Sequence, residues 1–268
     1  MIAVFKIGDR AMTNAFSDTA LKDIADTHGT IQTVIVHGGG DTVTRVAEQL
    51  NIPQQFVVSP EGFKSRVTDE KTIEVFTMVM GGKINKKIVR DLQKIGIPAV
   101  GLSGIDGGIL QASRKTRIIA KDSNGRRRVV EGGYTGKITR VEESLIQTML
   151  AEKYLPVIAP IALGTEFEPL NVDGDRAAAQ IAASLDADVL VLLTDVEHVQ
   201  VNGQPIGHWT VEEAKSQLAG IGPGMNTKLQ AAIEAVSLGV KKVVIAPAKG
   251  ESPYSDAING KSGTVITV

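Results

Sequence analysis

Two lysines and a run of glycines are the residues of this sequence best suited to hold phosphate groups. Gly38, Gly39 and Gly40 follow a β-branched stretch and precede a helix-like stretch, so their backbone N–H groups can approach an anion at the positive end of a helix. Lys6 stands within the apolar run IAVFKI, where a charged side chain is costly unless an anion or a carboxylate meets it. Lys228 belongs to GPGMNTK, a glycine-rich helix start that also favours an anion. Together these features predict phosphate binding.

Each of these features also has a purely structural explanation. The glycines could form only a tight turn, Lys6 could reach water from the end of its strand, and Lys228 could lie on a helix surface. The motif HGGGD has neither the Walker spacing nor the dinucleotide-binding spacing, so the sequence predicts a phosphate-binding fold of another kind. In NVDGD, Asn171 and Asp173 are candidate helix caps, and Asp175 is a candidate ion-pair partner of the lysines.

Short apolar strands alternate along the chain with amphipathic, helix-like stretches. Nearly continuous apolar strands separated by helices are typical of a parallel sheet covered on both faces. We therefore predict a three-layer α/β/α sandwich with a mainly parallel central sheet. The expected strands are 2–7, 33–37, 99–103, 156–162, 188–195 and 241–246. The expected helices are 16–28, 41–51, 69–95, 140–152, 174–186, 210–219 and 223–239.

The stretch 110–138 departs from this alternation. Two short extended runs flank DSNGR, which predicts a protruding β-hairpin with an Asn-Gly turn at 124–125. Between 114 and 128 there is one acidic residue, Asp122, and the basic residues are Arg114, Lys115, Arg117, Lys121, Arg126, Arg127 and Arg128. This is a local basic surface in a chain whose charges otherwise balance. A solvated hairpin edge that resists aggregation has the same composition.

The composition excludes several classes of function. The chain has 268 residues and a formal net charge of −1, so no overall field favours nucleic acid or an anionic membrane as a partner. The absence of cysteine excludes disulfides and thiolate chemistry and fits a reducing compartment. The histidines lack metal-ligand spacing, the first residues lack a signal-peptide pattern, and no apolar run is long enough for a membrane span. We expect a cytoplasmic protein in which no side chain binds a metal directly.

Motifs in the same order along the chain make it resemble the amino-acid kinase superfamily, and specifically the N-acetylglutamate kinase branch. They extend over essentially the whole sequence and are KIG, HGGG, SRVTDEKTIEVFTMV, GLSGIDGG, GYTGKI, PVIAPI, LNVDGDRAA, LLTDVEHV, GPGMNTKLQAA and GTVI. Within the branch, SPEGFKSR, SRKTRI, EGGYTGK, PLNVDGD and IGPGMNTK are most similar to the [LysW]-aminoadipate/[LysW]-glutamate kinases. Those enzymes phosphorylate an amino acid whose amino group is attached to a small acidic carrier protein. The resemblance therefore implies a partner of the LysW type for the basic hairpin.

The resemblance also implies roles for single residues. Lys6 and Lys228 match the lysines that stabilise the transferring phosphoryl group, and Asp175 matches the aspartate that organises them. The matches on the acceptor side are Gly39 and Gly40 in the phosphate loop, and Arg66 and Asn171, which hold the substrate's α-carboxylate. The matches on the ATP side are Gly8, Thr194, Asp195, Gly224 and Met225. The expected carrier contacts are Lys64, Arg114, Lys115, Arg117, Arg126, Arg127 and Arg128.

The implied organisation is a single kinase domain over 1–268, with an amino-acid side at about 1–165 and an ATP side at about 166–268. MgATP would donate the phosphoryl group, and the acceptor carboxylate, already ionised at pH 7, would need no general base. The implied assembly is a homodimer formed through a helix within 69–95. Two alternatives remain open: an N-acetylglutamate kinase acting on the free small molecule, and a non-catalytic amino-acid or nucleotide sensor.

Asp9 departs from the family's first motif, which is KxGG where this chain has Lys6-Ile7-Gly8-Asp9. An aspartate in place of the second glycine adds a carboxylate beside a phosphate site, and it costs energy if its φ is positive. The carboxylate could point away, pair with Lys228 or reach the metal ion. The sensor alternative depends on this departure.

Overall fold

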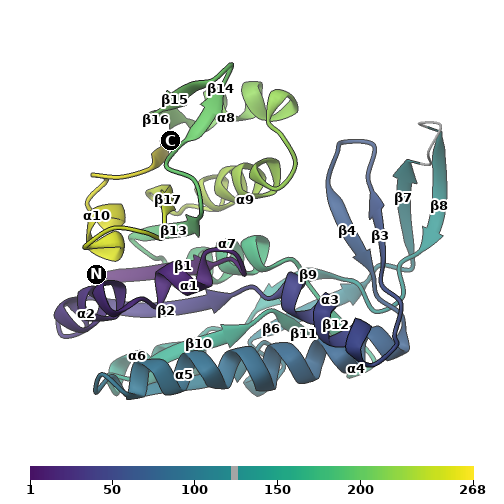
Figure 1. The fold of residues 1–268 in the computed structure, drawn as a ribbon, viewed down its shortest axis with the longest axis horizontal. Helices are drawn as coiled ribbons and strands as arrows, with labels where there is room; N and C mark the ends of the chain where they lie inside the picture. The colour runs from purple at the N-terminus through teal and green to yellow at the C-terminus, as the bar shows by residue number, and fades with distance from the viewer. Residues whose placement is uncertain (122–125) are drawn as a thin grey trace.

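A central sheet covered by helices on both faces organises the molecule (Figure 1). The computed structural model describes residues 1–121 and 126–268. The strands of this sheet lie in the order β16-β18-β17-β13-β1-β2-β10-β5. Their bounds are β1 Ile2–Ile7, β2 Gln32–His37, β5 Ala99–Ser103, β10 Leu155–Ala159, β13 Val189–Thr194, β16 His208–Thr210, β17 Val243–Pro247 and β18 Thr264–Thr267. Neighbouring strands from β5 to β17 are parallel, and only the pair β17–β18 is antiparallel among these neighbours.

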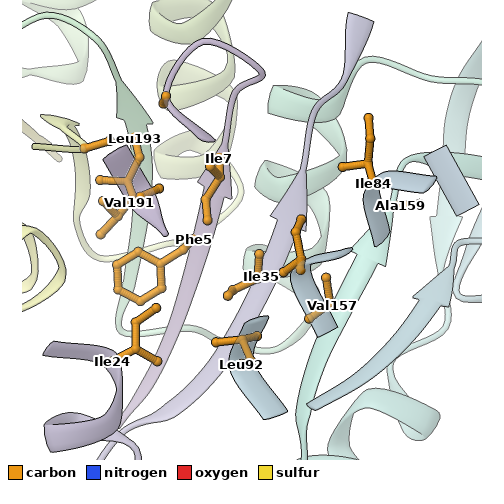
Figure 2. Close-up of a cluster of buried hydrophobic side chains, with 14 of the residues drawn as sticks. Phe5, Ile7, Ile24, Ile35, Ile84, Leu92, Val157, Ala159, Val191 and Leu193 are labelled. Carbon is orange, nitrogen blue, oxygen red and sulfur yellow. The ribbon is translucent and has the colours of Figure 1, made fainter. Parts of the chain in front are cut away.

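Different helices cover the two faces of the sheet, because successive residues of a strand point to opposite sides. In β1, Phe5 and Ile7 belong to one buried cluster and Val4 belongs to the other. Figure 2 shows the first cluster, in which Ile24 and Leu92 approach the strand side chains from the helices. This layer contains α1 Met12–Ala15, α2 Asp18–Thr27, α3 Gly40–Gln49, α4 Glu70–Thr77, α5 Asn85–Gln93 and α10 Pro253–Ile258. The opposite layer contains α6 Ser144–Ala151, α7 Gly174–Ser184, α8 Val211–Gln217 and α9 Met225–Ser237. The predicted three-layer sandwich is confirmed.

The helix predicted over 69–95 is not uniform. A π-helical segment, η1 (Met78–Ile84), lies between α4 and α5. Such segments are rare and occur frequently at functional sites. Here η1 lies against the glycine loop, because a Cβ added at Gly39 would overlap Ile84 Cδ1 and lie 2.6 Å from Met80 Sδ. No hydrophobic pattern in the sequence reports a contact of this kind.

Several predicted boundaries are wrong by a few residues. The helix expected at 16–28 begins at Asp18, after the separate short helix α1. The helix expected at 140–152 begins at Ser144, because residues 140 and 141 still belong to a strand. The strand expected at 156–162 divides at Pro160 into β10 and β11 (Ile161–Leu163), which join different sheets. Proline lacks the N–H that would continue the ladder.

A second sheet and two hairpins lie beyond the carboxyl end of β2 (Figure 1). The second sheet has the order β12-β11-β6-β9, with β6 at Leu110–Arg114, β9 at Gly136–Val141 and β12 at Pro169–Asn171. Strands β7 (Arg117–Lys121) and β8 (Arg127–Glu131) pair antiparallel, which confirms the predicted protruding hairpin. Its predicted Asn-Gly turn at 124–125 lies outside the described residues. The second hairpin, β3 (Gln55–Val58) with β4 (Lys64–Val67), was not predicted and stands beside the first (Figure 1).

The remaining elements are short. Strands β14 (Val199–Val201) and β15 (Gln204–Ile206) form a small antiparallel pair, and the 3₁₀ turns are η2 Asp106–Gly108 and η3 Leu218–Gly220. Along the described chain, none of the helices has both the length and the apolar composition needed to cross a bilayer.

Candidate active site

Lys6 and Lys228 meet at the carboxylate of Asp175. Lys6 comes from β1, whereas Asp175 and Lys228 belong to the beginnings of α7 and α9. The Lys6 Nζ lies 2.7 Å from Asp175 Oδ1, and the Lys228 Nζ lies 3.3 Å from each Asp175 oxygen. The Lys6 and Asp175 side chains are each 8% exposed and that of Lys228 is 15% exposed. The carboxylate that a lysine within an apolar strand requires is therefore supplied by α7.

Burial and the three charges act against each other in setting the pKa values at this centre. Burial acts to raise the pKa of Asp175, but Lys228 and Lys6 outweigh it and hold that pKa at about 2. Burial acts to lower the pKa of Lys6, yet the charge and hydrogen bond of Asp175 raise it above its ordinary value. The pKa of Lys228 is lowered by burial and by the Lys6 charge, against the attraction of Asp175. Two cationic side chains thus share one carboxylate, and an anion that arrives beside them is favoured.

A cavity of about 330 Å³ opens beside Lys6. It is lined by Gly39 and Gly40 of the glycine loop, by Arg66 of β4 and by Asn171 of β12. The structure therefore brings the predicted acceptor-side residues together around one space. Three apolar side chains from β3 and from the α4–η1 helix complete the lining on this side, namely Phe56, Phe76 and Met80.

Arg66 is buried and holds the start of α3. Its guanidinium donates to the Gly40 carbonyl oxygen at 2.8 Å, to Thr44 Oγ1 at 3.0 Å and to Gln54 Oε1. It also lies over the Phe56 ring, 4.7 Å from the ring centroid. A guanidinium has five N–H donors, and these bonds account for three of them. Arg66 is thus part of the support of the glycine loop and keeps donors for a ligand carboxylate.

Asn171 is held in a similar way. Its Nδ2 donates to Thr68 Oγ1 at 3.0 Å, and its backbone N–H donates to the Tyr134 carbonyl oxygen at 2.8 Å. It does not cap α7, because Asp173 takes that position and accepts from the Arg176 N–H at 2.9 Å. Of the two candidate caps in NVDGD, the structure selects Asp173.

The residues predicted to bind ATP do not line the cavity, and Gly8 among them lies beside Lys228. A Cβ added at Gly8 would lie 3.8 Å from Lys6 Nζ and 4.0 Å from Lys228 Nζ, so the bare backbone there borders both ammonium groups. Thr194 ends β13, next to β1, and its hydroxyl donates to Asp195 Oδ1 at 3.2 Å. The last two, Gly224 and Met225, begin α9, and Gly224 has a φ of 86°, a conformation that favours glycine.

The carboxylate of Asp9 binds the first turn of α3. Asp9 Oδ2 accepts from the Thr42 N–H at 2.7 Å, and Oδ1 accepts from the Thr42 hydroxyl at 3.2 Å. Asp9 is not among the residues with positive φ, so the strain considered for this position does not arise. The Lys228 ammonium pairs with Asp175 and not with Asp9. Thr42 carried no sequence signal for this contact.

The residues predicted to bind the carrier lie in several places on and around the two hairpins. Lys64 and Lys115 line the cavity. Arg114 donates to the Gly133 carbonyl oxygen at 2.6 Å and lies over the Tyr134 ring, so it supports the base of the hairpin. Another groove, of about 320 Å³, lies between the two hairpins and includes Lys115 together with Arg117 and Arg127. The two remaining arginines of this set, Arg126 and Arg128, are exposed on the β7–β8 hairpin.

A buried polar contact behind the glycine loop was missed by sequence reasoning. His37 ends β2 and is fully buried. Its Nδ1 bonds to the Gly38 carbonyl oxygen at 2.9 Å, so its Nε2 accepts from Asn85 Nδ2 at 3.3 Å. Asn85 also donates to the Val157 carbonyl oxygen at 2.9 Å. Burial lowers the pKa of His37 to about 4, so the ring is neutral at pH 7. This agrees with the expectation that His37 is a packing residue.

A layered α/β fold with two lysines on one buried carboxylate, beside a cavity lined by a glycine loop, fits an enzyme of phosphoryl transfer. The chain belongs to the amino acid kinase family, whose profile matches residues 1–247. A relative from Saccharolobus islandicus (strain L.S.2.15 / Lassen #1), the [LysW]-aminoadipate/[LysW]-glutamate kinase, is 44% identical over 264 residues, which are 98% of each chain. A Cenarchaeum symbiosum relative is 48% identical over 233 residues, 87% of this chain and 88% of that protein.

Solved structures share the fold. The crystal structure of smu.665 from Streptococcus mutans superposes with a TM-score of 0.81 at 26% identity and covers 99% of this chain and 98% of that chain. Carbamate kinase from Giardia lamblia bound to AMP-PNP superposes with a TM-score of 0.69 at 18% identity, with the same coverage. At 18% identity the second comparison establishes the fold alone. The predicted amino-acid kinase fold is confirmed.

Proposed function

We propose that this kinase transfers the γ-phosphoryl group of ATP to the side-chain carboxylate of 2-aminoadipate or glutamate attached to an acidic, LysW-type carrier protein, in lysine or arginine biosynthesis. The observation that carries the proposal is the convergence of Lys6 and Lys228 on Asp175 beside a glycine-lined cavity. Similarity to the Saccharolobus islandicus kinase over 98% of both chains supports the acceptor.

In the proposed reaction a carboxylate oxygen of the acceptor forms a bond to the γ-phosphorus, while the bond from that phosphorus to the bridging oxygen breaks and ADP leaves. The acceptor carboxylate is ionised at neutral pH, so no general base is needed. Lys6 and Lys228 neutralise the charge that the two reacting anions bring together, and Asp175 holds the two ammonium groups in place. Arg66 and Asn171 bind the α-carboxylate, and the amides of Gly39 and Gly40 approach the phosphoryl group.

The nucleotide is proposed to bring Mg²⁺ with it. Among residues 1–121 and 126–268, no group of three or more His, Cys, Asp or Glu side chains is placed to hold a metal ion. Mg²⁺ commonly keeps several waters and binds substrate phosphates through few protein ligands, so these residues fit an ion carried by the nucleotide. The ion would shield phosphate charge during transfer.

The same proposal assigns the ATP side to the region around Gly8, Thr194, Asp195, Gly224 and Met225. Here the carboxyl ends of β1 and β13 lie next to each other, and in open α/β sheets ligands bind beyond this edge. The single kinase domain would then have its acceptor side at about 1–165 and its ATP side at about 166–268. We further propose a cytoplasmic homodimer formed through the α4–η1–α5 helix, where Met78 is 57% exposed.

The carrier is proposed to dock on the paired hairpins. The groove between them shares Ser65 and Lys115 with the acceptor cavity, so a chain lying in the groove reaches the cavity directly. Arg117 and Arg127 line the groove against one acidic residue, Glu61. An excess of exposed cations accelerates the association of an acidic protein and makes its binding dependent on salt.

The decisive experiment traps the acyl phosphate with hydroxylamine and compares carrier-linked aminoadipate, carrier-linked glutamate and free N-acetylglutamate as acceptors. Hydroxamate should form with a carrier-linked acceptor at a kcat/KM at least about 10²-fold above that of the free compound, because the hairpin contacts exist only with the carrier. Turnover of N-acetylglutamate alone would make the chain an N-acetylglutamate kinase. ATP binding without acyl phosphate from any acceptor would favour the sensor alternative.

Charge reversal tests the docking surface separately. In a triple variant with Arg126→Glu, Arg127→Glu and Arg128→Glu, KM for the carrier-linked acceptor should rise at low salt, and the difference from the wild type should shrink as salt is added. The matched control is Lys241→Glu. Lys241 is exposed and pairs with Asp188, and the two residues precede the parallel strands β17 and β13, at the amino ends of the strands and away from the hairpins. An unchanged KM in the triple variant would leave the basic residues with the role of a solvated hairpin edge.

A further inference from the structure

Helix α3 begins at a residue that cannot cap it. The N-cap is Gly39, which has no side chain to accept a hydrogen bond from the first turn. A larger residue is excluded there, because a Cβ would lie 2.6 Å from Met80 Sδ and would overlap Ile84 Cδ1. The first N–H groups of a helix need acceptors, so a side-chain acceptor for α3 can come only from another residue.

Asp9 supplies this acceptor from the loop that follows β1. Its two carboxylate oxygens take the Thr42 N–H at 2.7 Å and the Thr42 hydroxyl at 3.2 Å. Thr42 is the third residue of α3, which is the position that an ordinary N-cap side chain would satisfy. The positive end of the helix also stabilises the negative charge. Asp9 is thus an N-cap provided by a different loop.

The same contact joins the two glycine-bearing loops of the candidate active site. The Gly38 N–H donates to the Ile7 carbonyl oxygen at 2.7 Å, and a Cβ added at Gly38 would lie 3.4 Å from Asp9 N. On the outer side of the contact, Arg10 Nε lies 3.6 Å from Asp41 Oδ2. Asp9 and Arg10 therefore both contact the first turn of α3, and the Asp9 carboxylate makes the shorter of the two side-chain contacts.

We propose that Asp9 is a positioning residue that fixes the Gly8 backbone relative to Gly39 and Gly40, so that both loops form one cradle for the nucleotide's phosphates. The proposal rests on the proposed function for the identity of that anion. It gives the departure from the family's KxGG motif a physical role, since the carboxylate is bound to α3 and does not face the phosphate as an unpaired charge. Two other roles for the Asp9 carboxylate are repulsion of phosphate and direct binding of Mg²⁺. Each predicts a different MgADP affinity for the Asp9 variants.

The test measures MgADP affinity by calorimetry and ATP kinetics in Asp9→Ala, Asp9→Asn, Thr42→Val and the double variant of Asp9→Ala with Thr42→Val. Asp9→Ala should weaken MgADP binding about tenfold and lower kcat/KM for ATP about 10²-fold, the scale of a misplaced reacting group. Asp9→Asn keeps an oxygen that accepts from the Thr42 N–H and should stay within about threefold of the wild type. The double variant should be no worse than Asp9→Ala, because both changes remove the same contact.

The matched control is Thr210→Ala, which removes the side-chain cap of α8. Strand β16 runs antiparallel to β17 through its pairing with β18, so Thr210 lies at the edge of the sheet opposite the cavity. This variant loses a helix cap of the same kind, and its nucleotide binding should equal that of the wild type.

Three results would overturn the proposal. MgADP binding that is unchanged or tighter in Asp9→Ala would mean that the carboxylate does not position the cradle or repels phosphate. A loss in Asp9→Asn equal to that in Asp9→Ala, relieved by more Mg²⁺, would make Asp9 a metal ligand. A loss of MgADP affinity in Thr210→Ala equal to that in Asp9→Ala would mean that the loss comes from a less stable fold and not from the position of the cradle. Nucleotide binding needs no acceptor, so a wild type that forms no acyl phosphate would defeat the proposed function and leave this test intact.

Discussion

Replacing Asp175 by Asn leaves two buried ammonium groups without their shared counter-ion. Lys6 Nζ is 2.7 Å and Lys228 Nζ is 3.3 Å from the same carboxylate oxygen, and these side chains are 15% exposed or less. Breaking a buried ion pair by removing one partner costs about 3–5 kcal/mol, because the remaining charge stays desolvated. We expect the free energy of unfolding of Asp175→Asn at pH 7 to be lower than that of the wild type by this amount.

The matched control is Glu212→Gln. Glu212 pairs with Lys215 at the same 2.7 Å, but its side chain is 77% exposed. Surface pairs contribute about 1 kcal/mol or less, so the control should unfold at nearly the wild-type denaturant concentration. The comparison shows that a short ion-pair distance alone does not set the cost, since the control pair has the same distance but lies on the surface.

The pH dependence of the loss of unfolding free energy in Asp175→Asn identifies the cause of that loss. Without Asp175 the folded-state pKa values of the lysines fall below the unfolded value of about 10.4. At a pH between the folded-state and the unfolded-state lysine pKa values, the unfolded chain binds more protons than the folded chain. The free energy of unfolding of the variant therefore rises with pH over this range. Urea denaturation at pH 7, 8.5 and 10 should therefore show a deficit that narrows with pH. A deficit of less than about 1 kcal/mol at pH 7, or one that is constant with pH, would refute the electrostatic explanation.

Two further substitutions test the supports of the glycine loop. Folded His37 has a pKa of about 4, lowered by burial from 6.5, so the wild type should lose about 3 kcal/mol of stability as pH falls from 6.5 to 4. His37→Gln should lack this loss in urea denaturation, and an identical pH profile would contradict the assignment. Gly39→Ala should cost about 1–3 kcal/mol by overpacking against Met80 and Ile84. Adding Ile84→Val, which removes the overlapping Cδ1, should restore part of that cost, and no recovery would show that the contact is not responsible.

The layers of the fold could be predicted because buried strands and helices show a regular pattern of apolar residues in the sequence. Alternating strand residues such as Val4 and Phe5 enter different cores, and strand runs of this kind are readable without a structure. Lys6 could be singled out for the same reason, since a charge in such a run requires a partner. The basic hairpin was also readable, because its extended runs flank a turn sequence.

Other features depend on contacts between distant segments and leave no local pattern. The need for glycine at position 39 arises from the close approach of the glycine loop to the π-helical segment η1. The hairpin β3–β4 was missed although its turn, Ser59 to Phe63, contains Pro60 and Gly62, which are turn-forming residues that sequence reasoning could have used. The partner of Asp9 could not be predicted either, since Thr42 is 33 residues away and an exposed-looking threonine has many possible roles.

The central claim is that Lys6 and Lys228 act together on one phosphoryl group. Its most direct test is the single-turnover rate of hydroxamate formation from MgATP and the carrier-linked acceptor in Lys6→Ala and Lys228→Ala, with both substrates saturating. Each variant should fold and bind MgADP yet transfer the phosphoryl group about 10²-fold more slowly or worse, the scale of losing one fixed charge stabiliser. A wild-type rate in either variant would contradict the claim.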